Sequence, residues 1–94
     1  MAKKKVNNAE VSVLIVKYNC GLNNHLTLRG EGAGLSWHHG TPLLNQGIDE
    51  WIFEIKAPDD FFECKVLIND QVFEIGDNHK ILKGKKITIH PKFS

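Results

Sequence analysis

The chain has 94 residues, of which 41% are hydrophobic and 24% charged, proportions typical of an ordinary globular domain. This length suits a single domain. The formal net charge of +1, from 12 basic and 11 acidic side chains, provides no electrostatic basis for binding nucleic acid or an anionic membrane.

Residues 1–10 are polar and include a run of three lysines at residues 3–5. We expect a flexible tail here, ahead of a single β-sandwich domain over residues 11–94, because chain ends are loose unless something ties them down. A short arm for nucleic acid is the alternative interpretation of the lysines. The tail lacks the apolar segment of a secretory signal, and no apolar run approaches the roughly 20 residues of a membrane-spanning helix. We therefore expect a cytoplasmic protein.

The cysteines, Cys20 and Cys64, do not form a close-spaced metal-binding or redox motif. In a reducing compartment both are expected to be thiols, with Cys64 packed as a small core residue. A disulfide between them is the alternative in an exported protein.

Strand patterns dominate the chain. Residues 11–18 are rich in β-branched side chains and predict a strand that is buried on much of both faces. After an asparagine-rich turn, residues 25–29 alternate, with Leu26 and Leu28 facing inward. The remaining predicted strands are residues 42–44, 51–56, 62–68, 71–74 and 86–90, the last with Ile87 and Ile89 inward.

Turn-forming residues separate these segments, among them residues 57–60 and Asn69-Asp70. No segment has the pattern of a helix of the usual length. The sequence therefore predicts an all-β fold, an immunoglobulin-like antiparallel β-sandwich of about seven strands. An up-and-down barrel is the alternative.

The glycine-rich segment at residues 30–34 is predicted to be a connecting loop. Its glycine spacing fits neither the dinucleotide-binding fingerprint nor the phosphate-loop motif, and no helix pattern follows to receive a phosphate.

Strand alternation predicts which side chains of residues 62–68 face solvent. Phe62, Cys64, Val66 and Ile68 face the core, so Glu63, Lys65 and Leu67 face outward. Across the turn, Val72 continues the core face, and Phe73 lies outward beside Leu67 and diagonal to Lys65. A one-residue slip of this hairpin would instead place Phe73 in the core.

Exposed aromatic rings beside hydrogen-bonding groups are typical of sugar-binding sites. A pyranose packs its C–H groups against a ring face, while its hydroxyls bond to charged and amide side chains. Trp37, Lys65, Phe73 and Asn78 supply such a set. Trp37 lies in a loop, where covering the end of the sandwich is the alternative role.

Several segments also carry a family resemblance. They are residues 26–30 (LTLRG), 35–37 (LSW), 42–43 (PL), 51–54 (WIFE), 62–70 (FECKVLIND) and 72–74 (VFE). In this order and spacing, over residues 24–80, the chain resembles the starch- and glycogen-binding modules, carbohydrate-binding module families 20 and 48. The resemblance implies an α-glucan site formed by the loop tryptophan, the lysine, the hairpin aromatic and a following asparagine. By position these are Trp37, Lys65, Phe73 and Asn78.

This chain departs from the family pattern at particular positions. Phe73 stands where tryptophan is usual, Cys64 replaces an inward tyrosine, and His38 and His39 replace acidic or polar loop residues. Family members normally accompany a catalytic domain, and the sequence of this chain predicts none. The resemblance implies a module that binds starch, glycogen or maltooligosaccharide, with a protein partner or a separate glucan-active enzyme as a second kind of partner.

The residues of an enzyme site are not grouped in the sequence. The histidines are scattered over predicted loops and strand ends, and no serine has a nucleophile-elbow context. A zinc site using His38 and His39, with His79 or Cys20 as a further ligand, is disfavoured because adjacent residues rarely ligate one ion together. We therefore predict no catalysis, no cofactor and no metal. A protein-interaction or regulatory module that has lost sugar binding is the alternative, with Trp37 and Phe73 anchoring the partner or a free sheet edge pairing with it.

Overall fold

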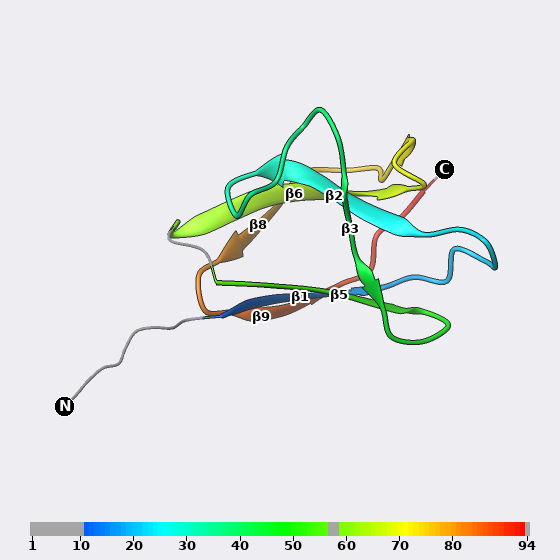
Figure 1. Cartoon of the computed structure of the whole chain (residues 1–94), viewed down its shortest axis with the longest axis horizontal. Coiled ribbons are helices and arrows are strands. Elements are labelled where there is room, and N and C mark those ends of the chain that lie inside the picture. The colour runs from blue at the N-terminus through cyan, green and yellow to red at the C-terminus, as the bar shows by residue number, and fades with distance from the viewer. Residues whose placement is uncertain (1–10, 57–58, 94) are drawn as a thin grey trace.

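The computed structural model describes residues 11–56 and 59–93, so the predicted tail at residues 1–10 and part of the predicted turn at 57–60 lie outside the described residues. Nine strands form the described part of the chain, which contains no helix long and apolar enough to cross a membrane (Figure 1). Their bounds are β1 Ser12–Lys17, β2 Leu26–Glu31, β3 Thr41–Pro42, β4 Leu44–Asn45, β5 Glu50–Ile55, β6 Phe61–Ile68, β7 Val72–Phe73, β8 His79–Leu82 and β9 Lys86–Ile89.

The strands form two sheets that lie as two layers (Figure 1). One sheet has the order β4-β5-β1-β9, and the other has the order β3-β2-β6-β7, with β8 also paired to β6. The predicted all-β class is confirmed, and the two layers are consistent with a β-sandwich. Pairing is antiparallel except between β1 and β9, which run parallel, so the wholly antiparallel prediction is wrong at that pair.

The predicted count of about seven strands is too low. The predicted strand at residues 42–44 is two short strands, because the chain passes from one sheet to the other at buried Leu43. Strand β8 was not predicted, since Ile81 is its one buried residue and the alternation is too brief to stand out.

A single cluster of side chains fills the space between the sheets. Leu14 and Val16 of β1 are fully buried there, as are Leu26 and Leu28 of β2, which confirms their predicted inward direction. From β6, the cluster contains Phe62, Cys64 and Val66, with Ile68 packed against it. Burying a side chain of this size contributes about 1.5–3 kcal/mol, so this cluster is the main stabilising feature of the two layers.

Predicted side-chain environments differ from the structure at three positions. Leu67 does face outward but is fully buried, since it lies beside Thr27 on a face that the loop at Gly40 crosses. Val72 was predicted to be core and is 47% exposed, because β7 is a two-residue strand at the sheet margin. Ile87, predicted inward, is 37% exposed because β9 is the last strand of its sheet.

The β6–β7 hairpin has the predicted register. Phe73 pairs with Leu67, which places both on the outward side of the sheet and excludes the slipped alternative. The turn is made by Asn69 and Asp70, whose φ angles of 54° and 57° are left-handed, as in the tight turns that favour asparagine and aspartate. The Gln71 N–H donates to the Ile68 carbonyl at 3.0 Å and closes the turn.

The predicted loop at residues 30–34 is partly strand. β2 continues through Gly30 and Glu31, and the loop begins after them. Gly30 lies so close to β6 that a Cβ atom would overlap the Glu63 carbonyl oxygen. Glycine is therefore required at this position by close backbone approach, and not by phosphate binding.

Candidate functional site

The candidate site lies on the side of the sheet β3-β2-β6-β7 that faces away from the other sheet, which we call the outer face. Alternation along β2 and β6 places Arg29, Glu31, Glu63 and Lys65 on this face. Arg29 is directly opposite Lys65 in the strand register, and Phe73 is opposite Leu67 on the other side of β6. The outer face therefore combines cations, carboxylates and an aromatic ring.

Arg29 lies at the centre of the outer face. Its Nε atom donates to Asp70 Oδ1 at 2.9 Å, and its two terminal nitrogens donate to the carbonyl oxygens of Asp70 and Trp37, each at 3.2 Å. The guanidinium carbon lies 5.6 Å from the centroid of the Phe73 ring, within the range of a cation–π contact. One side chain thus connects the loop that carries Trp37 with the hairpin that carries Phe73.

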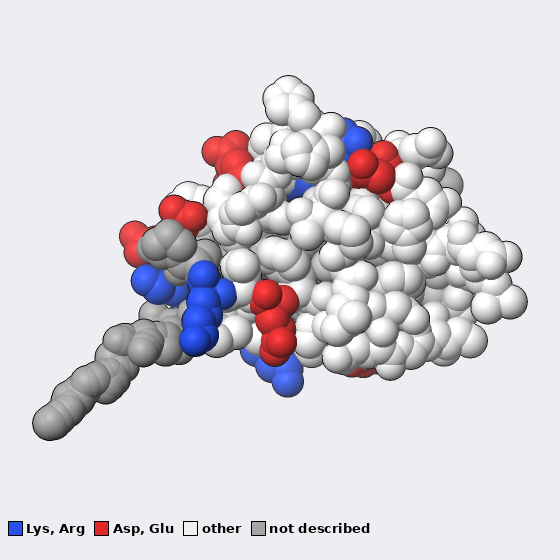
Figure 2. Space-filling model, in the orientation of Figure 1, with Lys and Arg blue, Asp and Glu red and all other residues white. Residues whose placement is uncertain are grey.

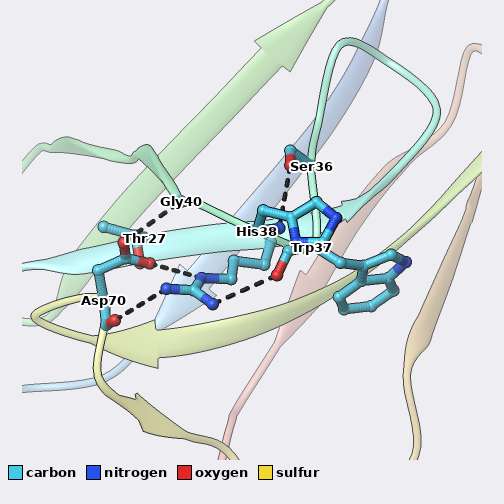
Figure 3. A network of polar contacts seen from close by, with 7 residues as sticks. Thr27, Ser36, Trp37, His38, Gly40 and Asp70 are labelled. Atoms are coloured by element: carbon cyan, nitrogen blue, oxygen red, sulfur yellow. Dashed lines mark hydrogen bonds and ion pairs between the residues drawn. The ribbon is translucent and has the colours of Figure 1, made fainter.

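Asp70 is the second member of this network (Figure 3). Its Oδ1 atom also accepts from the Thr27 hydroxyl, and Oδ2 accepts from the Gly40 N–H, both at 3.2 Å. The hydrogen bond from Arg29 is the main reason that the pKa of Asp70 is lowered from 3.8 to about 2. The carboxylate therefore stays ionised at neutral pH and holds the loop at Gly40 on the sheet.

Trp37 is half-buried, and its indole N–H donates to Glu31 Oε1 at 3.0 Å. The loop backbone is fixed on both sides of it, because Gly30 N–H donates to the Ser36 carbonyl at 3.1 Å and Arg29 binds the Trp37 carbonyl. The indole points away from the Asp70 end of the network (Figure 3). The ring is thus held over the outer face near the end of β2, and not in the core between the sheets.

The other predicted site residues lie on or beside the same face. Phe73 is 48% exposed, which leaves ring surface free beyond the contact with Arg29. Lys65 Nζ donates to the Glu74 carbonyl at 3.2 Å. Asn78 is exposed and precedes His79, which pairs with Cys64, so its backbone lies beside Lys65 at the sheet margin. The structure therefore places Lys65, Phe73 and the Trp37 backbone around Arg29, with the Trp37 ring directed towards Glu31 and Asn78 at the edge.

Glu74 stabilises the β6–β7 hairpin through a buried carboxylate. The Glu74 side chain is 2% exposed, and its Oε1 atom accepts a hydrogen bond from the Val66 N–H at 2.8 Å. Val66 lies in the part of β6 between the residues that pair with β7 and those that pair with β8. The Glu74 N–H donates to the Val66 carbonyl at 2.9 Å, and His79 Nε2 lies 2.8 and 2.9 Å from the two carboxylate oxygens. A side chain thus replaces the missing strand partner of Val66 and fixes the residue after Phe73.

Sequence reasoning did not identify Arg29, Asp70 or Glu74 as organisers of the site. Arg29 had a usable signal, because the inward direction of Leu26 and Leu28 implies that Arg29 faces outward, across from Lys65. Asp70 was interpreted only as a turn former. Glu74 offered no signal, since a glutamate at the end of a short strand is usually solvated.

A separate hollow of about 330 Å³ lies at the end of the sandwich, between the loops at residues 19–24 and 45–48, with Trp51 beneath them. Its rim carries the exposed aliphatic side chains of Leu22 and Ile48 among asparagines. This is the end at which the space-filling view shows almost no charged side chains (Figure 2). None of the predicted site residues lines it.

Both cysteines are free thiols in the structure. Burial, with a smaller contribution from Glu74, raises the pKa of the Cys64 thiol to about 12. Burial also raises the pKa of Cys20, which lines the hollow. Neither thiol is therefore activated as a nucleophile at neutral pH.

Within residues 11–56 and 59–93, histidine, cysteine and carboxylate side chains form no group of three or more suited to holding a metal ion. Comparisons of the chain with models of known protein families, with curated proteins and with solved structures find no match.

Proposed function

We propose that this chain is a non-catalytic α-glucan-binding module, and that starch, glycogen or a maltooligosaccharide lies across the outer face. The observation that carries the proposal is the placement of Trp37 and Phe73 on one face, connected through Arg29 and accompanied by Lys65. The family resemblance of the segments that contain these residues supports α-glucan as the sugar.

The chemistry of the outer face suits a sugar chain. Phe73 offers an exposed ring for the C–H groups of a pyranose, and the half-buried Trp37 offers a second ring held by Glu31. Lys65 and Asn78 carry amino and amide groups that would donate hydrogen bonds to sugar hydroxyls. An open face buries little of its ligand, so we expect weak binding, near a Kd of about 1 mM or about −4 kcal/mol.

We also propose that the two layers have the immunoglobulin-like arrangement. The parallel contact of the first and last strands and the crossing of the chain between sheets at Leu43 support this topology. Reduced thiols at Cys20 and Cys64 suit the cytoplasm, where we place the protein.

A protein-interaction module is the second candidate function. Its support is the exposure of three apolar side chains after the turn, which is 48% for Phe73 on the outer face, 47% for Val72 on the opposite side of β7 and 57% for Ile75. Aromatic and aliphatic anchors of this kind dominate the binding energy of protein interfaces. A separate glucan-active enzyme is the partner that such a surface would serve in this setting.

Affinity electrophoresis through gels that contain glycogen tests the proposal. The wild-type protein is expected to be retarded relative to a gel without polysaccharide. Trp37→Ala and Phe73→Ala are expected to abolish the retardation, because each removes one stacking surface.

Leu22→Ala is the matched control, since Leu22 is an 89% exposed apolar side chain outside the outer face. It should migrate as the wild type does, and circular dichroism should show that all variants keep their strand content. A wild-type protein that glycogen does not retard would refute glucan binding and favour the protein-interaction module. Equal retardation of Phe73→Ala and wild type would refute the assigned face.

A further inference from the structure

The second sheet has an uncovered side, which we call the β1 face. In β1, Ser12, Leu14 and Val16 are directed into the core, so Val13 and Ile15 are directed away from it. No described segment lies on this side of the sheet in the ribbon view (Figure 1). The β1 face therefore has apolar side chains without a covering layer among the described residues.

The strand registers order this face into cross-strand rows. One row is apolar except at its end and contains Leu44, Ile52, Ile15 and Thr88, of which Leu44 is 64% exposed. The next row contains Glu54, Val13 and Lys86, with an acid on β5, a valine on β1 and a base on β9. Opposite charges thus flank Val13, and a third row contains Lys17 and Glu50, whose side chains form an ion pair at 2.9 Å.

We propose that the β1 face docks on the same face of a second copy of this chain. Consider a two-fold axis that lies between the two β1 faces and runs parallel to β1. This axis places β5 of one copy opposite β9 of the other. It places Glu54 of each copy against Lys86 of the other, and Val13 and Ile15 against their own equivalents. Lys17 also meets its own equivalent, and each lysine stays paired with Glu50 of its own copy. This is the self-complementary pattern that an isologous interface requires, in which each contact occurs twice.

The arrangement of charge favours a second copy over other occupants. A face that binds an acidic or a basic partner is expected to carry charges of one sign. The row of Glu54, Val13 and Lys86 instead carries a negative charge at one end and a positive charge at the other. The packing is that of aligned sheets, which stack about 10 Å apart with interdigitated side chains.

The dimensions of the sheet set the strength of the association. The sheet has two residues in β4, six each in β5 and β1 and four in β9, so with strands about 4.8 Å apart and about 3.4 Å per residue its projected area is near 300 Å² per copy. This is below the size of standard specific interfaces, so we expect a weak, reversible dimer in the millimolar range. The dimer leaves both outer faces free and directed away from each other, which would make the assembly bivalent for a polymer.

Sedimentation velocity of the full chain over a range of concentrations tests the dimer, independently of any sugar. The wild type is expected to change from monomer to dimer as its concentration rises. Glu54→Lys and Lys86→Glu should each weaken dimerisation about tenfold, because each places like charges together at two symmetric contacts. The double variant Glu54→Lys with Lys86→Glu should return to within about threefold of the wild type, since it restores both opposite-charge contacts.

Asp77→Lys is the matched control, because it makes the same change in net charge as Glu54→Lys at an exposed position of the other sheet's β7–β8 loop. It should dimerise as the wild type does. A chain that stays monomeric at all concentrations would overturn the proposal. So would single variants that dimerise normally, or a double variant that does not recover.

Discussion

Replacing Glu74 tests how the hairpin that carries Phe73 is held. In Glu74→Ala, the Val66 N–H loses its acceptor at 2.8 Å in a place where water does not reach, because Val66 is fully buried. His79 loses its carboxylate partner in the same change. Glu74→Gln keeps an oxygen acceptor of nearly the same shape for Val66 and removes the negative charge.

The expected cost follows from these contacts. A buried donor left without a partner costs about 1–3 kcal/mol, and a hydrogen bond to a charged group contributes about 1.5–3 kcal/mol. The two effects overlap, so we expect Glu74→Ala to lower the free energy of unfolding by about 2–4 kcal/mol and Glu74→Gln by about 1 kcal/mol. For a domain of this size, the loss in Glu74→Ala corresponds to a fall in Tm of about 10–25 °C.

Urea unfolding followed by tryptophan fluorescence, with calorimetry for the Tm, measures both variants. Asp77→Asn is the control, since it neutralises an exposed acid near Glu74 and should change stability by less than about 0.5 kcal/mol. A loss below about 1 kcal/mol in Glu74→Ala, or equal losses in the alanine and glutamine variants, would refute the view that Glu74 substitutes for a strand partner.

Three further outcomes are expected. The pKa of Asp70 is lowered from 3.8 to about 2, chiefly by Arg29, so its stabilising contribution is present above pH 3.8 and is lost as the pH falls towards 2. Asp70→Asn should therefore flatten the fall in stability that urea unfolding measures over this pH range. An unchanged slope of stability against pH would contradict the assignment. Iodoacetamide should modify Cys20 slowly and leave Cys64 unmodified until the protein is denatured, because Cys64 is fully buried with a pKa of about 12. Mass spectrometry measures the modification, and labelling of Cys64 in the native protein would argue against its place in the core. Phe73→Trp should tighten glucan binding by a few fold in calorimetric titration if stacking area limits affinity, and an unchanged affinity would count against stacking at this position.

Much of the fold could be predicted from alternation alone. The inward series in β6 and the turn at Asn69-Asp70 were enough to place Phe73 on the outward side, which the pairing with Leu67 confirms. Strand alternation predicts the direction of a side chain, however, and not whether another segment covers it. Leu67 is buried on the outer side by a loop, and Val72 is exposed on the inner side because β7 is a two-residue strand at the sheet margin.

The organisation of the candidate site was less predictable. Hydrogen bonds from Arg29 to Asp70 and to the Trp37 carbonyl join segments far apart in the chain, and no local pattern signals such pairs. The split of residues 42–44 between two sheets and the parallel contact of β1 with β9 likewise depend on how distant strands pack. The roles of Trp37 and Phe73 in binding stay predictions.

The measurement that tests the central claim most directly is an NMR titration of the isotopically labelled chain with maltoheptaose at about millimolar concentration, near the expected Kd. We expect saturable shifts of the Trp37 indole N–H and of amides around Lys65 and Phe73, with none at Leu22 beside the hollow or at Ile15 on the β1 face. The absence of shifts, or shifts centred on the hollow, would contradict an α-glucan site on the outer face.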